Sequence, residues 1–131
     1  MKLKKINIGG TNYPIIMDIN VLEHIQNEYE SINQFERDIL GLRYQKDENG
    51  NQQYDMEGKP KMYVVEPSIK AIKVALPSMI NEALAIEADE KNTSWEPVTE
   101  EYIFRECTIS FEVLARIIHD EYKRCFKIKK A

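Results

Sequence analysis

The segment from Ser68 to Asn92, "SIKAIKVALPSMINEALAIEADEKN", constrains the fold most, because it is the longest stretch of regular apolar spacing in the chain. Its apolar residues recur at steps of three and four, which is the spacing of one face of an α-helix. The members of this central stripe are Ile69, Ile72, Val74, Leu76, Met79, Ile80, Ala83, Leu84 and Ile86. Pro77 lies inside the stripe, and an interior proline costs ~3 kcal/mol. Burial of each large aliphatic side chain returns ~1.5–3 kcal/mol, so we predict a kinked central helix or two abutting helices.

The N-terminal segment Ile6 to Tyr29, "INIGGTNYPIIMDINVLEHIQNEY", contains two short alternating runs around Gly9-Gly10. Glycine adopts positive φ at little cost, so the pair favours the turn of a β-hairpin. Asp18 or Asn20 then supplies a good helix N-cap. The helical spacing that follows is carried by Val21, Leu22, Ile25 and Tyr29.

Three further helices follow from similar signals. A short helix is predicted through Ile32, Phe35, Ile39 and Leu40, with Gly41 at its C-cap. Thr99 is expected to cap "EEYIFREC", and Ser110 is expected to cap the last helix. The predicted fold is therefore α+β and mainly α-helical: an N-terminal β-hairpin followed by a helical bundle, in a single domain over residues 1–131.

Residues 42–65 are predicted to form a second hairpin, exposed and mobile. Asn49-Gly50 is a strong hairpin turn and Glu57-Gly58 a second candidate. A two-residue turn at Asn49-Gly50 would place Tyr44 opposite Asp55, and neither face would then be continuously apolar. The segment from Asp47 onward fails the pattern of a calcium-binding loop, because it lacks glycine at the sixth position and glutamate at the twelfth.

Composition and charge limit the classes of function. Apolar residues make up 43% and charged residues 31% of the 131 residues, as in ordinary globular proteins. No apolar run approaches the ~20 residues that a membrane crossing needs. The formal net charge of -4 disfavours nucleic-acid binding by the whole protein. Eight acids lie between Glu82 and Glu106, and five bases lie between Lys123 and Lys130. The acidic segment of one copy would attract the basic segment of another, so a head-to-tail homo-oligomer remains open.

The chain offers little reactive chemistry. His24 and Glu28 are four residues apart, and His119 precedes Asp120, but neither pair has a third metal ligand at suitable spacing. Cys107 and Cys125 are the only cysteines and form no CxxC motif, so reduced thiols are expected. Gly9-Gly10 leads into a strand, which does not suit a dinucleotide phosphate cradle. We therefore predict no enzymatic activity, no metal site and no cofactor.

Taken in order, three stretches resemble a known family. They are "INIGGTNYPIIMDINVLEHIQNEYESINQFERDI", "IKAIKVALPSMINEALAI" and "VTEEYIF…ISFEVLARIIHDEYKRCF". The shared features are an N-terminal hairpin with a Gly-x-x-Tyr-Pro turn, a helix led by Asp, a central helix containing "MIN", and a closing helix after a Thr-Glu-Glu cap. Over nearly its whole length the chain resembles the tail assembly chaperones of long-tailed bacteriophages and prophages of Gram-positive bacteria.

This resemblance implies a non-enzymatic protein of the host bacterial cytoplasm that is absent from the finished virion. It would bind the long helical tape measure protein and keep it soluble while tail tube subunits assemble. A groove for an amphipathic helix would use five residues of the central stripe: Ile72, Leu76, Met79, Ile80 and Leu84. The alternative reading is that all five are simply core residues.

The C-terminus "CFKIKKA" adds one expectation that depends on the resemblance. Many members of the family produce a longer form by ribosomal frameshifting near the end of this reading frame, and the added domain recruits tail tube protein. Codons for Ile128-Lys129-Lys130 are able to form a slippery run. The alternative is a basic end that neutralises the dipole of the last helix through Lys123, Arg124 and Lys127.

Two other functions remain open at this stage: a structural virion protein of the tail completion or neck type, and a small regulatory or nucleic-acid-binding protein. A gene position between a tail tube gene and a very long tape measure gene would favour the chaperone.

Overall fold

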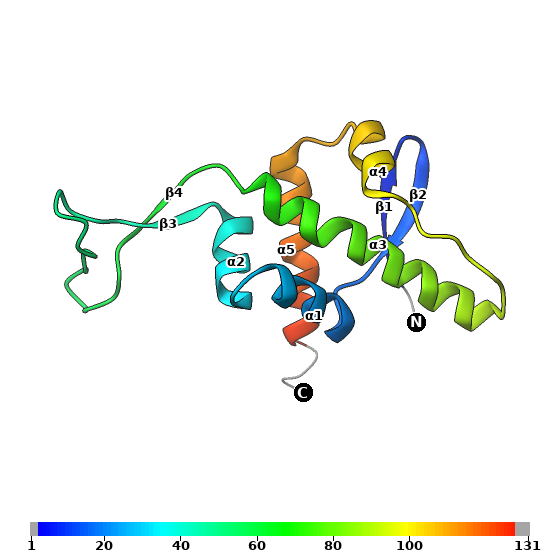
Figure 1. Cartoon of the computed structure of the whole chain (residues 1–131), viewed down its shortest axis with the longest axis horizontal. Helices are drawn as coiled ribbons and strands as arrows, with labels where there is room; N and C mark the ends of the chain where they lie inside the picture. The colour runs from blue at the N-terminus through cyan, green and yellow to red at the C-terminus, as the bar shows by residue number, and fades with distance from the viewer. Residues whose placement is uncertain (1–2, 128–131) are drawn as a thin grey trace.

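The computed structural model describes residues 3–127, and Figure 1 shows helices gathered around one long central helix. Nine elements follow one another along the chain: β1 (Lys4–Ile8), β2 (Thr11–Ile15), α1 (Ile19–Glu28), α2 (Ile32–Leu40), β3 (Leu42–Tyr44), β4 (Met62–Val64), α3 (Ile69–Lys91), α4 (Glu100–Glu106) and α5 (Phe111–Lys127). The fold is thus α+β, with an N-terminal β-hairpin ahead of the helices, as the sequence predicted.

The N-terminal hairpin pairs β1 with β2 in antiparallel register, with Ile6 opposite Tyr13. Gly9 and Gly10 form its turn with φ of 61° and 89°, which are the positive values that the sequence required of them. The chain leaving β2 is attached to the central helix, because the Ile16 N–H donates to the carbonyl of Met79 over 3.3 Å. The hairpin therefore covers one side of α3.

Side-chain caps start the helices, and the sequence predicted those of α1, α4 and α5 but not Ser31 at the start of α2. Asp18 Oδ1 accepts from the Val21 N–H at the start of α1, so Asp18 rather than Asn20 is the N-cap. The other N-cap side chains are Ser31, Ser68, Thr99 and Ser110. Each cap satisfies a backbone donor that the first helical turn leaves without an intrahelical acceptor.

The central helix α3 runs through Pro77 as a single element, not as two abutting helices. Proline lacks the N–H that would bond the carbonyl four residues earlier, at Lys73. Lys73 lies on the exposed side of α3, where water is able to hydrate the freed carbonyl. The buried part of the stripe offsets the remaining cost, since Leu76, Met79, Ile80 and Ala83 have no exposed area.

The core lies between α3 and the elements packed around it. Phe35 of α2 is fully buried, with its ring 5.8 Å from that of Tyr29 and 6.3 Å from that of Tyr122. The largest fully buried side chains are Phe35, Ile8, Ile15, Ile25, Ile39, Ile72, Leu76, Met79, Ile80, Ile103, Ile118 and Val21. They come from β1, β2 and all five helices, so a single core unites every element except β3 and β4.

Residues 42–65 leave this body as a long arm, seen at the left of Figure 1. The sequence predicted the exposure correctly, because no residue of the arm is buried. Its predicted pairing is wrong: Tyr44 lies opposite Met62, not Asp55, since β3 pairs with β4 and both turns lie beyond them. One face of the paired strands consequently carries four apolar side chains: Leu42, Tyr44, Met62 and Val64. We call it the apolar face of the arm.

Candidate functional site

The base of the arm is fixed to the body by short backbone contacts. Gly41 ends α2 in the left-handed conformation, with φ of 70°, and its carbonyl accepts from the Val65 N–H over 2.6 Å. The Ser68 N–H also donates to the carbonyl of Asp38 over 2.9 Å. A Cβ on Gly41 would lie 2.2 Å from the Val65 carbonyl oxygen, so only glycine permits this approach. The arm therefore leaves the body in a defined direction.

Beyond β3 and β4, three backbone segments meet in a closed ring of hydrogen bonds. The Gln45 N–H donates to Lys61, the Lys61 N–H donates to Gln53, and the Gln53 N–H donates back to Gln45. The three N···O distances are 2.8, 2.9 and 3.0 Å. This ring divides the arm into three lobes, of which two end in turns and the third leads back to the body.

The side chain of Gln52 fills the centre of the ring. Its Nε2 lies 3.1 Å from the Gln45 carbonyl oxygen, 2.7 Å from that of Gln53 and 3.3 Å from that of Lys61. The amide thus shares its two hydrogens among the three carbonyls that close the ring. Polar side chains that satisfy several backbone groups at once hold a loop without an apolar core.

The two lobes repeat one turn with the same internal bonds. Asp47 Oδ1 accepts from the N–H groups of Asn49 and Asn51, and Asp55 Oδ1 accepts in the same way from Glu57 and Lys59. Both turns have a glycine at positive φ three residues after the aspartate. Short acidic side chains that bond the backbone ahead of them are typical of tight turns.

The arm exposes much of the apolar surface that the fold leaves uncovered. Among the described residues, the large apolar side chains exposed on the arm are Tyr44, Tyr54, Met56, Met62, Tyr63, Val64 and Val65. Val64 is 77% exposed, and the guanidinium of Arg37 lies 4.9 Å from the ring centre of Tyr44. Tyr44, Met62 and Val64 share the apolar face of the arm, and grouped apolar surface marks an interaction site more often than isolated exposed residues do. We take the arm as the candidate partner-binding site.

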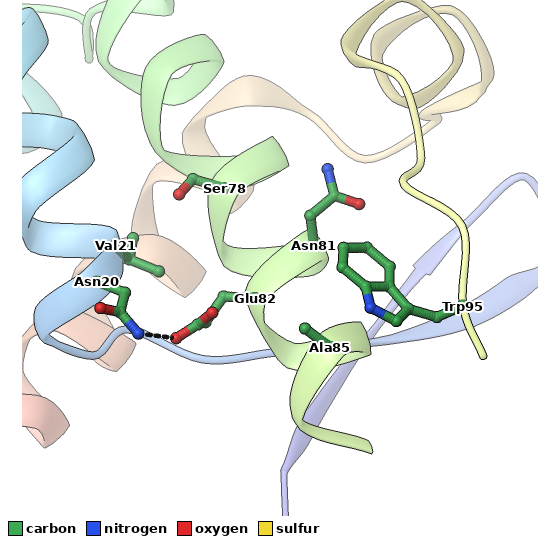
Figure 2. Close-up of a pocket in the computed structure, with 7 residues that line it drawn as sticks. All are labelled: Asn20, Val21, Ser78, Asn81, Glu82, Ala85 and Trp95. Atoms are coloured by element: carbon green, nitrogen blue, oxygen red, sulfur yellow. Dashed lines mark hydrogen bonds between the residues drawn. The ribbon is translucent and has the colours of Figure 1, made fainter. Parts of the chain in front are cut away.

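A cleft between α1, α3 and the chain before α4 is the other candidate, with a volume of about 260 Å³. Figure 2 shows the indole of Trp95 beside α3 on one side and Asn20 beside Glu82 on the other. Asn20 Nδ2 donates to Glu82 Oε2 over 2.7 Å, and Asn81 exchanges two hydrogen bonds with the backbone of Val98. The amides lining the cleft thus serve to hold α1 and the segment before α4 against α3.

The pKa of Glu82, which lines this cleft, is raised. The neighbouring carboxyl of Asp18 raises the pKa of Glu82 above its ordinary value of 4.5, and burial acts in the same direction. Hydrogen bonding from Asn20 partly opposes the shift. The nearby Asp18 carboxyl thus favours the protonated form of Glu82.

The structure places four of the five stripe residues predicted to bind a partner inside the core. Ile72, Leu76, Met79 and Ile80 have between 0% and 1% of their surface exposed. Only Leu84 is partly exposed, at the side of the core. A partner is unable to reach the other four while the fold is intact, so the surface open to binding lies elsewhere. Sequence periodicity located the buried stripe but does not separate core from interface.

Among the candidate reactive groups, His119 has structural partners. His119 Nε2 of α5 lies 2.9 Å from Glu36 Oε2 of α2, and this contact joins the two helices. The ring of His119 also stacks on that of Tyr122. Cys107 is half buried at the end of α4. Within residues 3–127, no group of three or more His, Cys, Asp or Glu side chains is placed to hold a metal ion. Over the same range, no helix has both the length and the apolar character that a membrane crossing requires.

Comparison of the chain with known protein families, curated proteins and solved structures gave no match. The sequence did not indicate the arm as a candidate binding site, because its apolar face exists only in the observed register. The signal that could have found it is the repeated Asp-x-x-Gly turn, which places both turns beyond the apolar strands. The residues of the frameshift expectation, 128–130, lie outside those that the structure describes.

Proposed function

We propose that this protein is a non-enzymatic tail assembly chaperone that binds a tape measure protein through the arm. The observation that carries the proposal is the apolar face of the arm, held away from the body on a fixed base. The resemblance of the sequence to phage tail assembly chaperones supplies the identity of the partner. The chain would act in the host bacterial cytoplasm and leave before the virion is complete.

The chemistry of the apolar face suits an amphipathic helix. Such a helix presents apolar residues at steps of three and four, and it aggregates when that stripe meets water. Three exposed side chains of this face would serve as anchors: the aromatic Tyr44, the flexible Met62 and the branched Val64. They are accessible without any rearrangement of the core. Covering the stripe of the partner would keep it soluble until tail tube protein replaces the chaperone. In this scheme tail tube protein is recruited by a longer frameshifted form.

Co-expression with the tape measure protein tests the proposal. The variant carrying Met62→Asp and Val64→Asp should leave the body folded and reduce the soluble yield of the tape measure protein toward the level without chaperone. Ile19→Asp is the matched control, because Ile19 is 60% exposed but lies on α1. The proposal fails if the arm variant, folded by circular dichroism, protects the partner as well as the unmodified chain does. If Leu84→Asp alone fails to keep the tape measure protein soluble, the binding site lies on the central helix instead.

A further inference from the structure

The outer edge of β4 has backbone groups that nothing in the described chain pairs with, because β3 and β4 form a sheet of two strands. The Gln45 N–H donates to the Lys61 carbonyl, and the Val65 N–H donates to the Gly41 carbonyl. The backbone N–H and C=O groups of the odd-numbered residues of this strand therefore point toward β3. Bonding direction alternates along an antiparallel strand. Met62 and Val64 therefore direct their N–H and C=O groups away from β3, along the open edge.

Two prolines limit the length of this edge. Pro60 precedes β4 and Pro67 follows it, and neither has an N–H to donate. Only a short strand is able to pair between them. An exposed edge with apolar side chains is a template for another strand, and β4 lies on the surface over its whole length.

We propose that a second copy of this chain pairs with β4 edge to edge, antiparallel, about a twofold axis at Tyr63. Met62 of one copy then lies opposite Val64 of the other, so their outward N–H and C=O groups satisfy each other on both sides of the axis. The result is a four-stranded sheet in the order β3, β4, β4, β3. Such closed twofold pairing is the commonest form of self-association.

The side chains select this register over its neighbours. Tyr63 faces Tyr63 across the axis, which is a favourable aromatic pair, and the Met62–Val64 pairs are apolar. Lys61 lies opposite Val65, which keeps the two lysines apart. Moving the axis to Val64 would set Met62 against Glu66, and moving it to Met62 would set Val64 against Pro60, which has no N–H to donate.

Pairing doubles the apolar face of the arm, since Met62 and Val64 lie on the same side of the sheet in both copies. The proposal nevertheless stands apart from the identity of the partner, because it concerns the edge of the strand and needs only the purified chain. Failure of the tape measure experiment would leave it unchanged.

Crosslinking tests the register directly. Directly opposite residues in the non-hydrogen-bonded position have Cα atoms about 4.5 Å apart, within the range of a disulfide. With Cys107 and Cys125 replaced by alanine, Tyr63→Cys should form a covalent dimer under mild oxidation. Met62→Cys is the matched control, since its exposure is similar, 40% against 49%, but it faces Val64 instead of itself. The proposal is overturned if Tyr63→Cys crosslinks no faster than Met62→Cys.

Sedimentation of the unmodified chain and of two substitutions at Val64 completes the test. The unmodified chain and Val64→Thr should sediment as dimers. Val64→Pro removes the outward N–H without touching a bond to β3, and it should sediment as a monomer with an unchanged helical spectrum. A monomeric unmodified chain at every concentration, or a dimer that survives Val64→Pro, would contradict the pairing.

Discussion

The body and the arm of this protein are held together by different forces. In the body, side chains from two strands and five helices bury one another, and most of the buried surface is apolar. In the arm, no side chain is buried, and the shape is set by backbone bonds around Gln52 and by two aspartate turns. Because the arm does not need its apolar side chains for folding, they remain available for a partner.

Truncating a core side chain gives the largest expected effect. Phe35→Ala removes a ring with no exposed surface from between Tyr29 and Tyr122. The free energy of unfolding should fall by about 3–5 kcal/mol, measured by urea denaturation. Tyr54→Ala on the arm is the control and should change it by less than about 0.5 kcal/mol. Similar losses in both would mean that arm and body are not energetically distinct.

Gly41 at the base of the arm and Gly50 near its end both have positive φ, but their surroundings differ. Gly41→Ala should lower the free energy of unfolding by about 2 kcal/mol or more, because positive φ is strained and the new Cβ meets the Val65 carbonyl. Gly50 has φ of 82° but open space around it, so Gly50→Ala should add only local strain of about 1–2 kcal/mol. Thermal unfolding should therefore shift more for Gly41→Ala than for Gly50→Ala, because the exposed turn at Gly50 is able to release its strain by opening locally. The reverse order would show that the base is not fixed.

Removing the central amide of the arm should produce a smaller effect, confined to that region. Gln52→Ala removes the side-chain amide that donates to three backbone carbonyls. The local stability of the arm should fall by about 1–3 kcal/mol. Amide hydrogen exchange should quicken at Gln45, Gln53 and Lys61 while the amides of α3 keep their protection. In the unmodified chain these amides of the arm should already exchange faster than the amides of α3. Gln53→Ala is the control, because the backbone of Gln53 forms the ring and its side chain does not.

The sequence was sufficient to predict the local parts of both regions. Caps such as Asp18 and Ser68, the Gly9-Gly10 turn and the helical spacing depend on neighbours within a few residues, so the pattern carries them directly. The turn that contains Asn49-Gly50 was also located correctly, although the bond from the Asp47 N–H to the Asn51 carbonyl closes a longer loop than the predicted two-residue turn. These features require no knowledge of what lies across the molecule.

The pairing of the arm and the location of the candidate binding site were not predictable in this way. β3 meets β4 because Gly41 and Val65 are brought together by α2 and α3, which are distant in the sequence. Likewise, an apolar stripe on a helix fits a core and an interface equally well, and only burial showed that Ile72, Leu76, Met79 and Ile80 belong to the core. Local propensity therefore gives the elements, while the contacts between them decide which surfaces remain free.

The smallest expected effect concerns a polar contact of the body, which we expect to contribute less than Gln52 does in the arm. The carboxyl of Asp18 raises the pKa of Glu82, so the folded chain holds a proton there more tightly than the unfolded chain does. Stability should accordingly fall as the pH rises from 4.5 through the higher pKa of the folded state. Glu82→Gln keeps a partner for Asn20, removes this slope and should stabilise the chain at neutral pH by about 0.5 kcal/mol or less, because solvent screens the partly exposed pair. Urea denaturation across this pH range, with Glu23→Gln on the exposed side of α1 as control, measures the difference. A loss of stability in Glu82→Gln comparable to that of Phe35→Ala would show that polar contacts hold the body as well, and would remove the distinction between the two regions.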